Sequence, residues 1–301
     1  MIALSFIIVT LFLASWSLAI TYRAQTRAWR YSWHRVWIGL SLAAFIYCYG
    51  AWVFISVYAR YAFAIAEIAI LLTGLFRKKI LARDQPGWKK AANIPVALLL
   101  NVLAILFYTG TTGRPPSLSL HAPFRRGTYA VQQGGKGLPA NLFHVSARNA
   151  IYAMDWVKLN RWGNRANTFF SAVLTDYNIF GDTVLCPCSG HILRIVDDNP
   201  DNIPPFRKRG PHNLNSVVIE SAGYYIFMGH FKEGSAMVAA GDSVQAGQPV
   251  ALAGNSGMSL EPHLHIQAHR KVNDGPWYTQ PPVQILFEGK EYWPSDVMRV
   301  R

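Results

Sequence analysis

The sequence contains little cysteine and little charge. Three cysteines among 301 residues are too few for a disulfide framework. Charged residues make up 15% of the chain and hydrophobic residues 51%. This balance excludes a disordered chain and a simple nucleic-acid-binding tail. The hydrophobic fraction is also high for a soluble enzyme, which indicates membrane-spanning segments.

Acidic residues are scarce in the first third of the chain, where most of the formal charge of +13 is located. Residues 1–91 contain eleven Lys or Arg but only two acids, Glu67 and Asp84, for a net charge of +9. The rest of the chain carries +4. A basic excess can indicate nucleic acid, an anionic surface or membrane topology. Its concentration in residues 22–35 and 77–90 favours topology.

Four apolar runs predict about four transmembrane helices. They cover Ile2–Tyr22, Val36–Tyr58, Tyr61–Phe76 and Ile94–Tyr108. A spanning helix needs about 20 apolar residues, which the first two runs supply and the last two reach by borrowing flanking residues. Because basic loops stay in the cytoplasm, the basic segments 22–35 and 77–90 place both the N-terminus and the C-terminal domain outside.

Two features of this region have alternative interpretations. The first run could be a cleaved signal peptide, but it lacks a positive leading region and a basic segment follows it. Glu67 interrupts the third run, where a buried acid is costly and frequently functional. It could equally pair with Arg60, face a neighbouring helix or be protonated.

A cluster of Gly, Thr and Pro after residue 110 predicts a domain boundary. We expect a helical domain over 1–110, a linker over 111–120 and a second domain over 121–301. In the second domain, short apolar runs alternate with turn residues, which is typical of an antiparallel all-β domain. A domain of this length can bury a core without disulfides.

Histidines are the most informative residues of the second domain. Residues i and i+2 of a strand point to the same side, so His263 and His265 would converge on one place. This arrangement suits a metal ligand beside a catalytic base. His230 ends another apolar run, and Asp155 ends an apolar stretch where a buried carboxylate needs a partner.

The order and spacing of five segments resemble those of the lysostaphin-type zinc metallopeptidases. The segments are Asn215–Glu220, Gly229–Phe231, Gly241–Gln248, Gly254–Gly257 and Pro262–His265. The resemblance extends more loosely over residues 118–290 and excludes the apolar first third. It implies a mainly antiparallel β domain of the lysostaphin-type peptidase fold and a zinc ion bound by His, Asp and His.

Carried onto this sequence, the resemblance makes Asp155 and His265 zinc ligands and makes His230 and His263 catalytic histidines. The expected position of the first histidine ligand, four residues before the aspartate, is occupied by Ile151, which cannot bind zinc.

His144 is the nearest upstream histidine, and a longer loop between it and Tyr152–Asp155 fits a variant of the family. We therefore interpret His144 as the first zinc ligand. His121, or the absence of a third ligand, remains an alternative.

Three protein ligands leave one zinc position open, as in catalytic rather than structural sites. His230 and His263 would orient the water, move its proton and stabilise the oxyanion. The resemblance thus implies a zinc metalloendopeptidase acting on peptidoglycan peptides. We expect a multi-pass protein in the lipid bilayer of the bacterial cytoplasmic membrane, with its C-terminal domain on the periplasmic or extracellular side. We expect no nucleic-acid partner.

Two other functions are compatible with parts of the sequence. A degenerate, non-catalytic regulator that binds and activates a cell-wall hydrolase would explain the displaced first ligand. A lipoyl-type carrier would explain the hairpin around Gly241–Gln248, but no modifiable lysine lies between Lys232 and Lys271. Four helices exceed what a tether needs, which suggests a membrane or cell-wall-synthesis partner protein.

The remaining candidates have structural interpretations. We expect His269 to lie farther along the rim of the site, and His191 and His212 to be solvated. Cys186 and Cys188 lie on one expected strand, without the second cysteine pair that a structural zinc site needs. We interpret both as packing residues.

Overall fold

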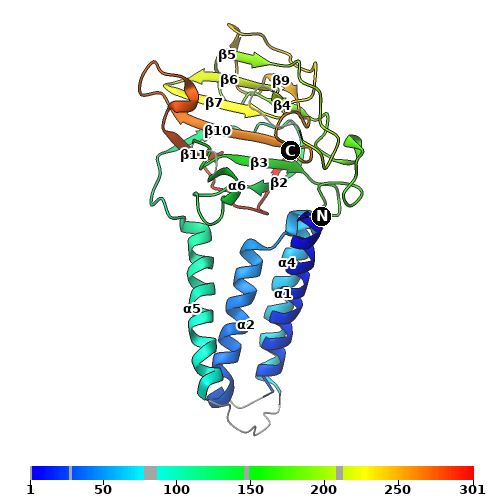
Figure 1. The fold of residues 1–301 in the computed structure, drawn as a ribbon, viewed down its shortest axis with the longest axis vertical. Coiled ribbons are helices and arrows are strands. Elements are labelled where there is room, and N and C mark those ends of the chain that lie inside the picture. Colours follow the sequence, from blue (N-terminus) through cyan, green and yellow to red (C-terminus); the bar gives the residue numbers. More distant parts are fainter. Residues whose placement is uncertain (1, 27–28, 78–86, 146–148, 208–212) are drawn as a thin grey trace. The chain divides into compact units, whose positions relative to one another are not determined.

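The computed structural model describes residues 2–26, 29–77, 87–145, 149–207 and 213–301. The chain divides into two compact units, Met1–Thr109 and Gly110–Arg301. Figure 1 shows that the first consists of helices and the second mainly of strands.

In its described residues, the first unit contains four long helices and one short helix. They are α1 (Ile2–Ala24), α2 (Trp29–Tyr49), α3 (Trp52–Ile55), α4 (Val57–Leu75) and α5 (Gly87–Thr109). α1 packs against α2 and α4, and α2 packs against α5. By length and composition, α1, α4 and α5 each contain a segment able to cross a membrane. The expected N-terminal helical fold is therefore confirmed.

The bounds expected for the second apolar run were wrong. α2 ends at Tyr49, before the short helix α3, and the hydroxyl of Ser56 then accepts a hydrogen bond from the Tyr58 amide to cap α4. α2 also begins earlier than expected and takes in His34 and Arg35 of the basic segment. These polar residues lower its hydropathy, and α2 is not among the three candidate spans.

Polar side chains join the helices in the interior of this unit. The Ser17 hydroxyl on α1 donates a hydrogen bond of 2.8 Å to Glu67 Oε1 on α4. Arg60 donates from Nε to the Tyr47 carbonyl at 2.9 Å, and its guanidinium lies 4.1 Å from the Tyr47 ring centroid. Of the alternatives for Glu67, the structure therefore shows contact with a neighbouring helix.

The second unit is built on a ten-stranded sheet. Its central path runs β12-β2-β3-β10-β7-β6-β5-β8, and β11 pairs with both β10 and β1. The bounds of these strands are β1 (Ser117–Leu120), β2 (Gly127–Gln133), β3 (Met154–Lys158), β5 (Gly190–Val196), β6 (Ser216–Ser221), β7 (Tyr224–Gly229), β8 (Ser243–Val244), β10 (Leu264–Arg270), β11 (Pro282–Phe287) and β12 (Val297–Val300).

The remaining elements of this unit are short. They are the strand pair β4 (Thr183–Leu185) and β9 (Pro249–Leu252), the helix α6 (Leu142–Val145), and the 3₁₀ turns η1 (Leu174–Asp176) and η3 (Trp277–Thr279). Among the described strand pairs, β1–β11 is parallel and the others are antiparallel. The mainly antiparallel fold is therefore confirmed. β1 lies in the segment that the sequence assigns to the linker.

Side chains alternate between the two faces of the central strands, and one of these faces forms the apolar core. Leu264 and Ile266 of β10 and Trp156 of β3 are fully buried in one apolar cluster, which also contains Val184 and Val250 of the β4–β9 pair. Because successive strand residues point to opposite faces, the intervening polar residues of β3 and β10 lie on the other face of the sheet. Figure 1 shows β3, β10 and β7 side by side.

Candidate metal centre

The first two residues of the centre lie opposite each other on two neighbouring strands. Asp155 on β3 and His265 on β10 are register partners in the antiparallel ladder. The separation between His265 Nδ1 and Asp155 Oδ1 is 2.9 Å. Both residues occupy the face opposite the apolar core, because their neighbours Trp156 and Leu264 fill that core.

His144, on the short helix α6, completes a group of three. Its Nε2 lies 3.2 Å from Asp155 Oδ2, and its ring centroid lies 5.1 Å from that of His265. One ligand atom from each of His144, Asp155 and His265 lies within 4.8 Å of the others. The structure thus brings together the three residues expected to bind metal.

Two further histidines adjoin this group. His263 Nε2 lies 3.6 Å from Asp155 Oδ1, and the ring centroids of His230 and His263 are 4.4 Å apart. His230 Nδ1 lies 2.7 Å from the Ser256 carbonyl oxygen. Since a carbonyl only accepts hydrogen bonds, His230 carries a proton on Nδ1, which leaves Nε2 available for chemistry. His230 adopts a φ of 68°, a conformation that non-glycine residues rarely adopt and that is frequent at functional sites.

The charges within the group explain its protonation. Burial alone would raise the pKa of Asp155, but the nearby charges of His144 and His263 and hydrogen bonds from His144 and His265 hold that pKa well below its usual value. Burial lowers the pKa of His144, yet the Asp155 carboxylate outweighs it and raises the pKa overall. Burial, with repulsion from His263 and His265, keeps the pKa of His230 well below its usual value. These shifts favour the ionised form of Asp155 and the neutral form of His230.

A buried ion pair, which no pattern in the sequence indicated, supports the segment that carries His263. Arg165 donates from Nε to Glu261 Oε1 at 2.7 Å and from Nη2 to Oε2 at 2.8 Å. Gln132 donates to the same carboxylate at 2.6 Å. The Glu261 carbonyl in turn lies 2.8 Å from His263 Nδ1. Arg165 and Glu261 therefore hold the backbone that orients His263.

Two amide side chains, Gln267 and Asn141, contact two histidines of the centre, and Gln267 also contacts His269. Gln267 Oε1 lies 2.9 Å from His265 Nε2, and Gln267 Nε2 lies 2.8 Å from His269 Nε2. On the other side of the centre, Asn141 Oδ1 lies 2.7 Å from His144 Nδ1. The expectation that His269 lies on the rim was wrong, since its side chain is fully buried. The available sequence signal was the spacing of two residues between His263, His265, Gln267 and His269, which places these side chains on one side of the strand.

The other candidates lie apart from the centre. His121 is exposed and contacts Glu288 at 3.1 Å, so it does not replace His144 in the group of three. His191 is exposed beside Ser243, and His212 lies outside the described residues. Cys186 is fully buried in the apolar cluster, in agreement with its interpretation as a packing residue.

The residues present fit a zinc ion. Two imidazole nitrogens and a carboxylate oxygen are zinc donors, and a set of three protein ligands leaves one position of a tetrahedral site open. The neighbouring His230 and His263 are not needed as ligands, so they can take part in proton transfer. Sets of three protein ligands with one open position are typical of catalytic zinc sites, whereas structural sites have four protein ligands.

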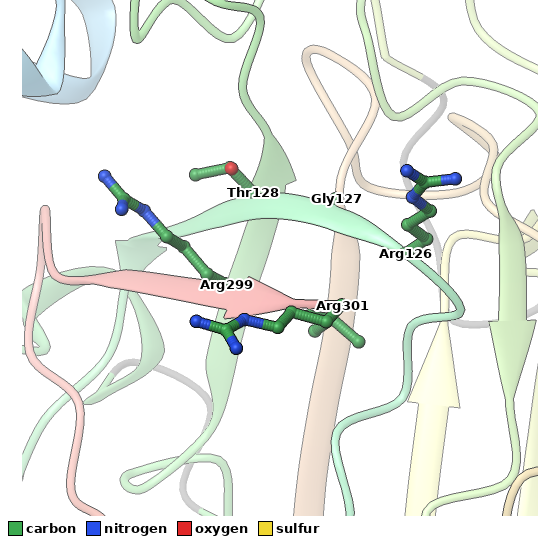
Figure 2. A pocket seen from close by; sticks show the side chains of 6 residues that line it. Arg126, Gly127, Thr128, Arg299 and Arg301 are labelled. Carbon is green, nitrogen blue, oxygen red and sulfur yellow. The ribbon is translucent and has the colours of Figure 1, made fainter.

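A separate cavity of about 530 Å³ lies where β2 and β12 pair. It is lined by Arg126, Gly127, Thr128, Arg299, Val300 and Arg301. Figure 2 shows that the three arginine side chains point in different directions rather than converging. The cavity contains none of the residues of the metal centre.

Comparison with known proteins finds a family match within the second unit. Residues 176–276 match the model described as Peptidase family M23, so the chain carries a lysostaphin-type M23 domain. This segment contains His230, His263 and His265, whereas His144 and Asp155 precede it. No curated protein matches the chain.

Three solved structures illustrate the similarity. Lysostaphin from Staphylococcus simulans is 22% identical, with 48% of this chain and 44% of that chain covered and a TM-score of 0.29. The catalytic domain of the prophage-encoded M23 protein EnpA from Enterococcus faecalis is 17% identical, with 56% of this chain and 93% of that chain covered and a TM-score of 0.32. A zinc-containing peptidase from Vibrio cholerae is 18% identical, with 60% of this chain and 41% of that chain covered and a TM-score of 0.30. The chain spans 44% to 60% of the length of the first three structures it matches.

Proposed function

We propose that this chain, which carries a peptidase family M23 domain, is a membrane-anchored zinc metalloendopeptidase that hydrolyses peptide bonds of the bacterial cell wall. The observation that carries the proposal is the grouping of His144, Asp155 and His265, with ligand atoms within 4.8 Å of one another. His230 and His263 lie beside this group. Its members come from α6, β3, β10 and the segments next to β7 and β10, so the whole fold is needed to assemble it.

In this proposal His144 Nε2, an Asp155 oxygen and His265 Nδ1 would hold the zinc. When bound, the zinc would act as a Lewis acid that activates water and polarises the scissile carbonyl. The Asp155 carboxylate also balances part of the charge of the cation. Three protein ligands would leave one position of a tetrahedral zinc for water or substrate.

The two remaining histidines would move protons. Their Nδ1 atoms face the Ser256 and Glu261 carbonyls, which fixes the ring orientations and leaves Nε2 as the reactive nitrogen. His263 Nε2 lies on the Asp155 side of the group, where it can accept a proton from the attacking water. His230 would stabilise the developing oxyanion or return the proton to the leaving amine.

The helical unit supports the location that we propose. Three of its helices are long and apolar enough to cross a membrane, and basic residues concentrate in residues 22–35 and 77–90. With these segments in the cytoplasm, a multi-pass arrangement would place the second unit outside, where peptidoglycan peptides are available as substrate.

The regulator alternative is less well supported by the geometry. That alternative was based on the displaced first histidine ligand, because Ile151 occupies the position four residues before Asp155 where this ligand is expected. His144 supplies a nitrogen 3.2 Å from Asp155 at the same centre. A complete set of three ligands favours the enzyme.

The test uses the full-length chain in detergent, loaded with zinc and incubated with cross-linked muropeptides. We expect cleavage by the wild type and loss of cleavage in His265→Ala and His263→Ala. His191→Ala, which changes an exposed histidine, is the control and should retain full activity. Equal cleavage by wild type and His265→Ala, or no cleavage by zinc-loaded wild type, would contradict the proposal.

A further inference from the structure

We infer that Asn202 is a positioning residue for His230: its side-chain amide fixes the segment 254–259, whose Ser256 carbonyl holds the His230 ring. Asn202 lies in the connection between β5 and β6, to which neither the sequence motifs nor the centre itself assigned a role. The inference rests on the proposed function for its purpose. The hold on the segment can nevertheless be measured without any cleavage.

The segment 254–259 contacts His230 at both the ring and the backbone. His230 Nδ1 lies 2.7 Å from the Ser256 carbonyl oxygen. The Gly254 amide donates to the His230 carbonyl at 2.9 Å. The Ser256 hydroxyl donates at 2.8 Å to the carbonyl of the next residue, Phe231. A shift of this segment would therefore move the His230 ring together with its backbone.

The backbone of His230 depends on such support. Its φ of 68° lies in the left-handed region, and a non-glycine residue keeps that conformation only where the surrounding contacts determine it. The Phe231 amide donates to the Asn215 carbonyl at 3.2 Å, and Asn215 Nδ2 donates to the Phe231 carbonyl at 3.2 Å. The Asn215 amide in turn donates to the Ser256 hydroxyl at 3.1 Å. Ser256 and Asn215 together hold the residue that follows His230.

Asn202 joins three carbonyl groups of the segment. Its Nδ2 lies 2.6 Å from the carbonyl oxygen of Gly257, 2.9 Å from that of Asn255 and 3.3 Å from that of Ser259. Carbonyl oxygens only accept, so these contacts require the NH₂ group of the amide. The Asn202 backbone amide also donates to the Asn255 carbonyl at 3.1 Å, and Asn255 Nδ2 donates to the Asn202 carbonyl at 2.8 Å. Asn202 therefore holds the segment through both its side chain and its backbone.

The carboxylate of Asp201 joins the same segment to the residues that follow His230. Its Oδ1 accepts from the Asn255 amide at 2.5 Å, and its Oδ2 accepts from the Glu233 amide at 3.4 Å. Glycine at position 254 permits this close approach, because a Cβ there would lie 2.3 Å from Lys232 N and 2.6 Å from Asp201 Oδ1.

These contacts are shielded from water. Asn202 is 5% exposed, and Asn215, Asn255 and Ser256 are 0% exposed. Water cannot readily replace a lost donor at such positions, and an unpaired buried carbonyl is costly. Removal of the Asn202 amide should therefore displace the segment rather than leave it in place.

Asp197 provides a matched comparison within the same connection. Its Oδ1 accepts from the Ser235 amide at 3.1 Å, and its Oδ2 accepts from the Ala236 amide at 3.0 Å. Like Asn202, it joins backbone groups of another segment through its side chain. The groups that it joins lie in residues 235–236 rather than in the segment 254–259.

The experiment compares zinc-loaded, full-length wild type, Asn202→Ala, Asn202→Asp and Asp197→Ala in detergent. Amide hydrogen exchange of residues 254–259 measures the hold on the segment, and muropeptide cleavage gives kcat and KM. Asn202→Ala should exchange faster there and lose about 10- to 100-fold in kcat, since a misplacement of about 1 Å can cost about 10²-fold. KM and zinc content should be unchanged. Asn202→Asp keeps the shape without the NH₂ group, so it should lose at least as much. Asp197→Ala should match the wild type in kcat and in exchange of 254–259.

The outcomes separate this inference from the proposed function. Unchanged exchange of 254–259 or unchanged kcat in either Asn202 variant would overturn the inference, as would a loss of kcat matched by an equal loss of zinc. Faster exchange in Asn202→Ala but not in Asp197→Ala, in a chain that cleaves no muropeptide, would support the positioning of His230 and contradict the endopeptidase. Should Asn202→Ala fail to fold, Asn202→Ser keeps one donor and should show the same changes to a smaller extent.

Discussion

Each unit of the chain buries a carboxylate, and the two carboxylates have different surroundings. Glu67 in the helical unit is 5% exposed and accepts a hydrogen bond from the Ser17 hydroxyl. Asp155 in the β unit is 9% exposed and lies beside three histidines. The first arrangement joins two apolar helices through a neutral hydroxyl. The second concentrates several nitrogens that a cation could use, so the partners rather than burial indicate which acid carries chemistry.

The largest expected effect comes from exchanging each acid for its amide. Asp155→Asn keeps the shape but removes the charge and a strong zinc donor, so cleavage should fall by on the order of 10³-fold or more, since the metal supplies several kcal/mol of transition-state stabilisation. Glu67→Gln should leave cleavage unchanged. Initial rates on cross-linked muropeptides measure both. Similar losses of cleavage in the two variants would contradict the view that only Asp155 takes part in the chemistry.

The next effect concerns a charge pair in the β unit; among the described residues, Glu67 has no such cationic partner in the salt bridges that the structure shows. The Arg165 and Glu261 side chains are 4% and 12% exposed. Arg165→Met leaves a buried carboxylate without its cation and should lower the free energy of unfolding by about 3–5 kcal/mol. The double variant Arg165→Met/Glu261→Met should recover most of this loss. Urea unfolding of the β unit in the full-length chain measures it, and a loss that is additive in the double variant would show that the pair is not coupled.

A smaller effect is the pH dependence of the β unit. Burial lowers the pKa of His269 in the folded state, whereas the unfolded side chain titrates near 6.5. Below about pH 6.5 the unfolded chain therefore binds a proton that the folded chain does not, and stability falls as pH falls, by at most about 1.4 kcal/mol per pH unit for this group. In metal-free protein, His269→Gln should reduce this slope between pH 6.5 and 5. The exposed-site control His191→Gln should leave it unchanged, and equal slopes in all three proteins would contradict the assignment.

The smallest effect is expected in the helical unit. Ser17→Ala removes the hydroxyl that reaches Glu67, and hydrogen bonds between membrane helices contribute about 0.6 kcal/mol on average. Unfolding of the helical unit in mixed micelles should shift by about this amount, with zinc affinity unchanged. A large change in zinc affinity would show that the two carboxylates are coupled after all.

Much of the fold followed from local patterns in the sequence. Short apolar runs with turn residues between them predicted the antiparallel domain, and the alternation of His263 and His265 on β10 predicted that both face one side. The second apolar run was misjudged because hydropathy is continuous from Val36 to Tyr58, while the backbone breaks after Tyr49. A hydropathy pattern does not record where a helix ends inside an apolar segment.

The centre was harder to derive because its parts are distant in the chain. The register that places Asp155 opposite His265 joins residues 110 positions apart, which no local pattern encodes. His269 was assigned to the rim because alternation gives the face of a strand but not what covers that face. In the structure the Gln280 carbonyl and the Trp277 ring cover it. Gln267 and Asn141 were missed for the same reason, since amides lack a spacing signature.

The central claim is that His144, Asp155 and His265 hold one zinc ion, and zinc content tests it most directly. Full-length wild type and His144→Ala would be purified in detergent, loaded with zinc, dialysed against a weak chelator and analysed for metal per chain. The account predicts one zinc per wild-type chain and a clear loss in His144→Ala. A wild type without zinc, or equal zinc content in the two proteins, would contradict it.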